Sequence, residues 1–461
     1  MGFMNEFKRE MRNAIRDVDK EANKTWKVEF QGHLIEVVHQ MKEEHLMIDG
    51  IVVDKHVRTS ILSYLTPYSH LTGTLNLGDG QKHTVSVRLG GFSLKALKCR
   101  VKINQVTVLE DSRKLEFLPW NHKEKILPYI QHQIQTHGKI VDDRLPDDDY
   151  VYDENHPRQA AGLSDLILDH EPVPFLAKKL LKLFKKQIHH PSTKTRSATY
   201  EEILSEHIVN YREDLIECFK QAQLDETLVQ REALWLLEHA THREVVKFAL
   251  TVLGCTDSQI HMEILLQIGM HEEFTAYVVF IFVDEPNASN ESIWELAQSV
   301  YGWGKLVAVE HLEATTPEIK QWLLTKGGDG LFMHKHFVFE CALKGELARA
   351  LYPEQISKEL YDGAGHMIQA LLDMLDPDPE IEEYLLEEAI LFRYVGHARF
   401  HCRTIEDFHP LMSISTFLNS EKAWEGRSDD LWMQQERASI QQELQGFLDD
   451  PNCPVLAMEK V

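Results

Sequence analysis

Two histidines four residues apart are the side chains of this sequence best spaced to do chemistry. His397 and His401 fall on a predicted helix, where this spacing places both imidazoles on one face. Cys402 follows directly, and His409 lies downstream. Two such ligands with a carboxylate from a neighbouring helix would suit zinc or iron. The pair is therefore a candidate metal site, and the alternative is that both are ordinary packing and surface histidines.

Signatures of the common enzyme classes are absent from the sequence. It contains no GxxxxGK[ST] loop, no GxGxxG after a strand, no GxSxG elbow and no HExxH helix. The glycine-rich run at residues 327–330 lacks the lysine of a phosphate loop and is interpreted as a corner between helices. No cysteine stands in a haem-ligand context, and no cofactor is predicted. A catalytic function would therefore depend on the histidine pair.

A repeating pattern along residues 228–326 predicts the elements around which the chain is organised. Each unit has an apolar run, a short corner and a second apolar run, and the corners fall at residues 239–243, 270–272 and 302–304. A period between roughly 20 and 50 residues is typical of helix pairs that stack because one pair cannot bury its apolar faces alone. The pattern predicts an α-solenoid that extends over residues 161–425, with its clearest repeats at 226–326.

Four aromatic residues near the repeat corners are candidates for binding a partner. Trp294, Tyr301, Trp303 and Trp322 would be interaction hot spots if their side chains are exposed. The alternative for each is packing between helix pairs.

Before the repeats, the apolar period changes to two. Alternating runs from Thr25 onward, with turns at Asp49-Gly50 and Gly78-Asp79-Gly80, predict seven or eight short strands. Strands at this spacing are typical of an antiparallel β-sandwich, which we place at residues 24–120. The predicted fold class is therefore α+β and multidomain, with the sandwich followed by the helical array.

Three further segments complete the predicted organisation. Residues 1–23 have apolar residues at helical spacing and predict an amphipathic helix. Residues 121–160 predict a helix and an acidic linker, in which the acidic run at 141–155 marks the main domain boundary. Residues 426–461 predict a last helix and a tail.

A basic helix past the linker is the sharpest charge anomaly of the chain. Its lysines include Lys178, Lys182 and Lys185, and its apolar residues share one side. Such a helix can bind an acidic partner or an anionic membrane surface. The alternative is a capping helix whose lysines are solvated or face the acidic linker.

Composition limits the partners and the compartment. The formal net charge of −24 repels phosphate backbones, so nucleic acid is excluded as the expected partner. The six cysteines form no CxxC pair or dense framework, which indicates a reducing cytoplasm. No secretion signal is recognised, and the longest apolar run, residues 276–283, is far shorter than the roughly 20 residues that span a bilayer.

Two resemblances accompany these patterns. The first rests on Trp26-x-Val28, on His33-x-Ile35-Glu36 with His39, and on Ile48-Asp49-Gly50 with Val52. This order resembles the opening strands of the Fas apoptotic inhibitory molecule family over residues 24–110. The resemblance implies a compact all-β fold that binds proteins and has no catalytic residues.

The second resemblance lies in the repeats, at Gly302-Trp303-Gly304-Lys305, Glu310-x-Leu312 and Pro317-Glu318-Ile319-x-x-Trp322-Leu323-Leu324. Residues 226–345 resemble the HEAT-like helical arrays of bacterial proteins, some of which carry the label limonene hydroxylase. That label implies a monooxygenase, although no residue here corresponds to an oxygenase motif.

The sequence thus predicts a cytoplasmic, non-catalytic scaffold that binds a protein partner in a solenoid groove. The alternative is a metal-dependent or oxidative enzyme with its site near His397 and His401. A peripheral membrane protein that uses the basic helix is a third possibility.

Overall fold

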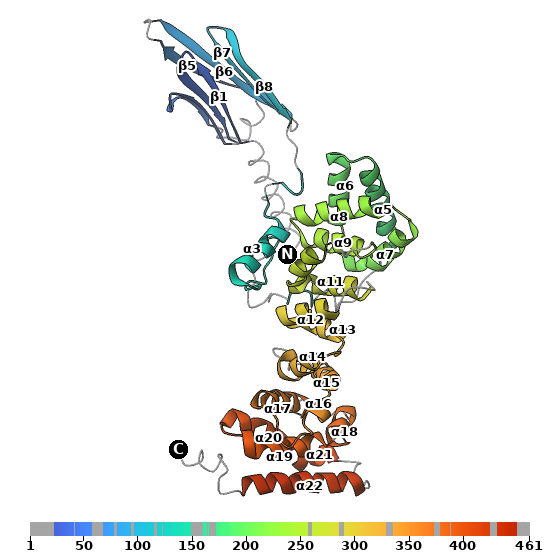
Figure 1. Cartoon of the computed structure of the whole chain (residues 1–461). Helices are drawn as coiled ribbons and strands as arrows, with labels where there is room; N and C mark the ends of the chain where they lie inside the picture. The colour runs from blue at the N-terminus through green and yellow to red at the C-terminus, as the bar shows by residue number, and fades with distance from the viewer. Residues whose placement is uncertain are drawn as a thin grey trace. The chain divides into compact units, whose positions relative to one another are not determined.

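The computed structural model describes two compact units, Met1–Glu124 and Lys125–Val461 (Figure 1). The residues described are 23–40, 42–57, 68–77, 81–93, 96–114, 118–121, 123–148, 160–163, 165, 172–256, 261–284, 290–328, 335–372, 379–387, 389–424 and 431–449. The predicted helix over residues 1–23 lies outside them except for Asn23, and the predicted tail from residue 450 onward also lies outside them. Strands fill the first unit and helices the second, as predicted.

The first unit contains two four-stranded antiparallel sheets, each with its strands in sequence order. The first sheet comprises β1 (Lys24–Phe30), β2 (His33–His39), β3 (Glu43–Ile48) and β4 (Ile51–Val57). The second comprises β5 (Tyr68–Asn76), β6 (Lys82–Ser93), β7 (Ala96–Ile103) and β8 (Val106–Lys114). Consecutive strands therefore pair with each other, which keeps all ladder connections local.

The turn at Asp49-Gly50 confirms one of the two turns read from the sequence. Asp49 and Gly50 have φ of 53° and 79°, a left-handed conformation that Asp and Gly tolerate better than most residues. The Asp49 carboxylate also accepts the backbone N–H of Leu34 at 2.9 Å. The second turn, at residues 78–80, lies outside the described residues, but β5 and β6 on either side of it pair antiparallel.

The two sheets share one apolar core, as a sandwich requires. Alternate side chains point inward, and those that are buried are Trp26, Ile35, Val37, Leu46, Ile48, Leu71, Leu75, Val85, Val87, Leu89, Leu97, Cys99, Val101 and Ile103. Two aspartates tie the sheets together at their edges. Asp111 of β8 accepts the Nε1–H of Trp26 at 2.7 Å, and Asp54 of β4 accepts the backbone N–H of Thr72 at 2.7 Å.

The second unit is built of helices (Figure 1). They are α3 (Ile126–His137), α5 (Pro174–His189), α6 (Thr193–Ile203), η1 (Ile208–Asn210), α7 (Arg212–Gln221), α8 (Glu226–His239), α9 (Arg243–Leu253), α10 (Met262–Gly269), α11 (Glu272–Asp284), α12 (Asn290–Ser299), α13 (Gly302–His311), α14 (Pro317–Trp322), η3 (Leu323–Gly327), α15 (Lys335–Lys344), α16 (Leu347–Ala350), α17 (Lys358–Leu372), α18 (Pro379–Glu387), α19 (Ile390–His401), α20 (Ile405–Asn419), α21 (Glu421–Trp424) and α22 (Leu431–Leu448). Within the described part of the chain, no helix combines the length and apolarity needed to cross a membrane.

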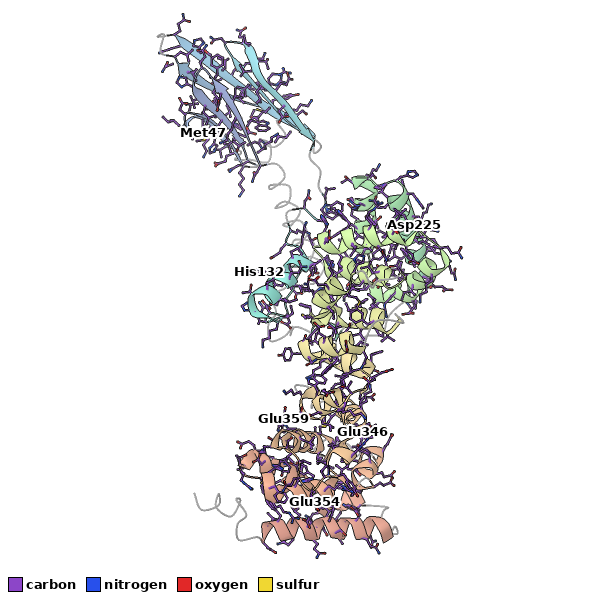
Figure 2. All side chains as sticks on the ribbon, viewed as in Figure 1. Met47, His132, Asp225, Glu346, Glu354 and Glu359 are labelled. Atoms are coloured by element: carbon purple, nitrogen blue, oxygen red, sulfur yellow. The ribbon has the colours of Figure 1, made fainter. Side chains whose placement is uncertain are left out.

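Polar residues begin several of these helices as N-caps. Asp225, labelled in Figure 2, accepts the backbone N–H of Leu228 at 3.1 Å at the start of α8. Thr404 and Asp407 form a reciprocal capping box at the start of α20. Each cap satisfies backbone donors that the first helical turn leaves free, which fixes where the helix begins.

Successive helices pack in pairs, α8 with α9, α10 with α11 and α12 with α13. The second helices of the pairs also pack on one another, α9 on α11 and α11 on α13 (Figure 1). The corners read from the sequence at residues 239–243 and 270–272 separate these helices. The third corner lies at residues 300–301, so Gly302, Trp303 and Gly304 form the first turn of α13 instead.

The acidic segment, predicted to be a linker at the main domain boundary, makes specific contacts where the structure describes it. The units divide between Glu124 and Lys125, before α3, and residues 141–148 belong to the helical unit. The side chains of Asp147 and Asp148 are 6% and 9% exposed. Both carboxylates are paired with Arg243. This partner lies far away in the sequence, so the charge of the acidic segment alone does not predict the contact.

Candidate binding surfaces and buried charges of the helical unit

A buried lysine is the centre of a cluster of polar contacts in the second unit. Lys247 lies on α9, and its side chain is 1% exposed. Its Nζ atom is 2.6 Å from Asp165 Oδ2, 2.7 Å from Glu273 Oε1 and 3.9 Å from Glu244 Oε1. Burial alone would lower the pKa of Lys247, but these carboxylates raise it above its usual value. The ammonium is therefore charged at neutral pH.

Arg243, one turn earlier on α9, binds the acidic segment. Its backbone N–H donates to Asp147 Oδ2 at 2.8 Å, and its Nε atom donates to the same oxygen at 3.1 Å. The guanidinium also pairs with Asp148 and lies 3.4 Å from Glu273 Oε2. These carboxylates keep the pKa of Arg243 above its usual value although burial opposes the charge. One side chain thus joins residues 147–148 to α9 and α11.

The two glutamates of the cluster each accept a backbone N–H from another segment. Glu273 accepts from Gly162 at 3.1 Å, and Glu244 accepts from Ile208 at 2.7 Å. Burial would raise the pKa of Glu273, but Lys247 and Arg243 lower it to about 2. Both carboxylates therefore serve as fixed acceptors that position chain segments outside their own helices.

Glycines around Glu272 allow this close packing. Gly162 has φ of 74°, and a Cβ atom there would lie 2.6 Å from the carbonyl oxygen of Glu272. Gly302 has φ of 52°, and a Cβ atom there would lie 2.6 Å from Glu272 Oε2. A Cβ atom at Gly304 would lie 2.6 Å from Thr275 Oγ1. The glycines that open α13 are thus explained by its contact with the first turn of α11.

The ionisation states of this cluster argue against catalysis within it. A general base or nucleophile needs a pKa near the working pH, whereas Lys247 and Glu273 are shifted in the directions that hold their charges. The sequence pattern alone did not reveal this cluster. The signal was a single lysine inside the apolar run at residues 245–253, preceded by an acid. Two of the carboxylates around Lys247, Asp165 and Glu273, come from residues far away in the sequence, so local pattern does not reveal them.

His397 and His401 each bind the loop between α16 and α17. The Nε2 atom of His397 lies 3.0 Å from the carbonyl oxygen of Leu351. His401 hydrogen-bonds the backbone of Ile356, and burial lowers its pKa. The opposite atoms, His397 Nδ1 and His401 Nε2, are buried and have no hydrogen-bond partner among the described residues. Backbone partners of this kind also orient metal-bound histidines.

The coordination sphere that a metal would need is not complete around this pair. No group of three or more His, Cys, Asp or Glu side chains among the described residues is arranged to hold a metal ion. The adjacent Cys402 is buried and ends the helix. The two histidines therefore offer at most two ring nitrogens, and their observed contacts position residues 351–356.

The predicted hot-spot aromatics differ in exposure. Tyr301 is 55% exposed, whereas Trp294, Trp303 and Trp322 are each partly buried. The Lys305 ammonium lies 5.3 Å from the centre of the Trp322 ring and donates to the carbonyl of Lys326 at 2.6 Å. Tyr301 is thus the aromatic of this set that is most accessible to a partner.

The surface of the helical unit has hollows among the described residues. One, of about 740 Å³, opens between the starts of α14 and α17 and the α15–α16 connection. The ion pair of Lys320 and Glu346 lies on its wall, and Leu324 and Leu360 contribute apolar surface. Another, of about 720 Å³, borders α7. Hollows of this size accommodate a few side chains of a peptide.

The basic helix of the sequence analysis is α5. Its apolar side packs into the unit, with Leu176, Leu180, Phe184 and Ile188 buried. Lys178 and Lys182 are exposed, and Lys185 is partly buried. Phe175, at the start of the same helix, is 83% exposed. A large exposed aromatic next to several lysines makes this face the strongest candidate binding surface.

The chain matches no protein-family model, no curated protein and no solved structure. Function is therefore argued from the residues of this chain.

Proposed function

We propose that this protein is a non-catalytic, cytoplasmic scaffold, whose helical unit is a HEAT-like array that binds a protein partner. The observation that carries the proposal is the equivalence of two successive helix corners. His242 Nδ1 accepts the backbone N–H of Glu244 at 3.2 Å before α9, and His271 Nδ1 accepts that of Glu273 at 3.3 Å before α11.

These corners agree in more than their caps. The residues are 29 positions apart in the sequence, within the range of helical repeats. Both glutamates are about 5% exposed or less, and both accept a backbone N–H from another segment. In each corner a histidine caps the helix and a buried glutamate follows two residues later. Unrelated corners are not expected to share both features. The shared chemistry supports a repeat.

Stacked helix pairs leave long surfaces that suit an extended partner. Tyr301 lies at the corner before α13, and the hollow beside Lys320 and Glu346 borders the start of α14. Tyrosine is frequent among residues that dominate binding energy. The sandwich supports the same function, because two four-stranded sheets around one core agree with the all-β, protein-binding fold that the Fas apoptotic inhibitory molecule resemblance implies.

Site-specific photo-crosslinking in the native host tests the scaffold. Benzoylphenylalanine replaces Tyr301 in one variant and Met412, an exposed residue of α20, in a control variant. We expect a discrete adduct with another protein from position 301 and none from position 412. Equal labelling from both positions, or no adduct from either, would contradict binding at this surface.

A metal-dependent or oxidative enzyme is the second candidate. It is favoured by the buried ring nitrogens of His397 and His401 that lack partners among the described residues. Elemental and absorbance analysis of the natively purified protein tests it. Stoichiometric metal or a chromophore that is lost in a His397→Ala/His401→Ala variant would establish this candidate.

A further inference from the structure

One face of α5 concentrates positive charge on an otherwise acidic chain. We define the α5 basic face as Phe175, Lys178, Lys182, Lys185 and Lys186. The helix contains no acidic residue, and the whole chain has a net charge of −24. The spacing of three and four residues puts these side chains on one side of the helix, opposite the buried Leu180 and Phe184.

The charges on this face are not neutralised within the described part of the protein. Lys179, at its edge, pairs with Glu202 at 2.6 Å. No ion pair of Lys178, Lys182, Lys185 or Lys186 occurs among the described residues. Like charges four residues apart on a helix repel each other and destabilise it. The chain has 73 acidic residues, and among the described ones only Glu202, bound to Lys179, pairs with a lysine of this helix.

We propose that the α5 basic face binds an acidic segment of a partner protein, with Phe175 as its apolar anchor. The inference rests on the proposed scaffold function and names the chemistry of a partner. Lys178, Lys182 and Lys186 follow one another every four residues, about 6 Å apart along the helix axis. A helix with glutamates at the same interval presents carboxylates at matching distances.

The structure favours a protein segment over a lipid surface. An interfacial membrane helix inserts its apolar face among the acyl chains. The apolar face of α5 is not available for this, because Leu176, Leu180, Phe184 and Ile188 are buried in the unit. Phe175 alone offers limited apolar area to a bilayer. The charge of the whole chain also opposes approach to an extended anionic surface or to a nucleic acid.

The test measures binding of a defined peptide to the full-length protein. The probe is a fluorescein-labelled, 16-residue helical peptide with glutamate at every fourth position, and its control carries glutamine instead. Fluorescence anisotropy is recorded at 50 and 300 mM NaCl for the unmodified protein, for K178Q/K182Q/K186Q and for F175A. The matched control is K82Q/K98Q/K102Q, which removes the same charge from β6 and β7. Circular dichroism verifies that each variant is folded.

We expect the α5 triple variant to weaken binding about tenfold, because it removes three exposed charge pairs that each contribute modestly. The β-strand triple variant should change the Kd less than twofold. F175A should weaken binding severalfold with an unchanged salt dependence, because it removes apolar contact and no charge. If both triple variants lose the same amount of peptide binding, the effect depends on net charge and not on α5, and the proposal is overturned.

Two further outcomes are informative. Vesicles containing 30% phosphatidylserine that bind the protein when the acidic peptide does not would overturn the proposal in favour of a membrane surface. If the peptide does not bind but crosslinking from position 301 captures a partner, this inference fails and the scaffold stands. If the peptide binds and crosslinking yields nothing, the proposed surface at Tyr301 fails and the α5 site stands.

Discussion

The Nζ atom of Lys247 lies 2.7 Å from Oε1 of Glu273, and these side chains are 1% and 4% exposed. Breaking a buried pair by removing one partner leaves an uncompensated charge. Lys247→Met should therefore lower the free energy of unfolding by about 3–5 kcal/mol. Urea unfolding followed by circular dichroism at 222 nm, which reports the helical unit, measures this loss.

Lys179→Met is the matched control for that experiment. Lys179 pairs with Glu202 at 2.6 Å but is 56% exposed, so water screens the pair. Its loss should cost less than about 1 kcal/mol. Similar effects of the two substitutions would contradict the structural role assigned to Lys247.

The low pKa of Glu273 predicts how stability depends on pH. An acid whose pKa falls from 4.5 when unfolded to about 2 when folded stabilises the protein fully above pH 4.5 and loses this effect as the pH falls toward 2. The difference corresponds to about 3 kcal/mol. Glu273→Gln should lower stability at pH 7 and flatten its decline between pH 4.5 and 2. Unfolding curves at a series of pH values measure this, and parallel declines of both proteins would exclude Glu273 as the cause.

The sequence predicted the strands and corners better than the buried charges, for a physical reason. Hairpin turns such as Asp49-Gly50 and helix corners such as His271-Glu272 depend on neighbouring residues, whose backbone preferences are local. Lys247 and Asp165 are 82 positions apart, and their contact depends on how the helices pack. From the sequence alone, a lysine within an apolar run is expected to extend its ammonium group to solvent, because its distant carboxylate partner is not known.

The same distinction applies to the acidic segment. Asp147 lies in a run that reads as a linker because it has few apolar residues. In the structure it is held by Arg243. These residues are ordered by pairing with an opposite charge from a distant segment. The local hydrophobicity of the sequence does not predict such pairing.

Close packing of α13 on α11 makes Gly304 sensitive to a methyl group. A Cβ atom there would lie 2.6 Å from Thr275 Oγ1, whose hydroxyl donates to the carbonyl of Gly269 at 2.8 Å. Gly304→Ala should therefore destabilise the helical unit by about 1–3 kcal/mol. Gly446→Ala, on α22 with no atom within 4 Å of its Cβ position, should stabilise by up to about 1 kcal/mol. Urea midpoints of the two variants that shift in the same direction would contradict this packing.

Substitution of His397, which contacts Leu351, distinguishes a structural role of the histidine pair from a metal-binding role. Leu351 is 1% exposed, and removing the imidazole would leave its carbonyl without the His397 donor. His397→Ala should cost about 1–3 kcal/mol in protein treated with a chelator, whereas the exposed His409→Ala should cost almost nothing. A metal role predicts a different result, in which the loss occurs only in untreated protein and chelation brings the unmodified protein to the stability of the variant. Unfolding curves with and without chelator therefore decide between the two roles, because only a bound metal makes the effect of His397 depend on the chelator.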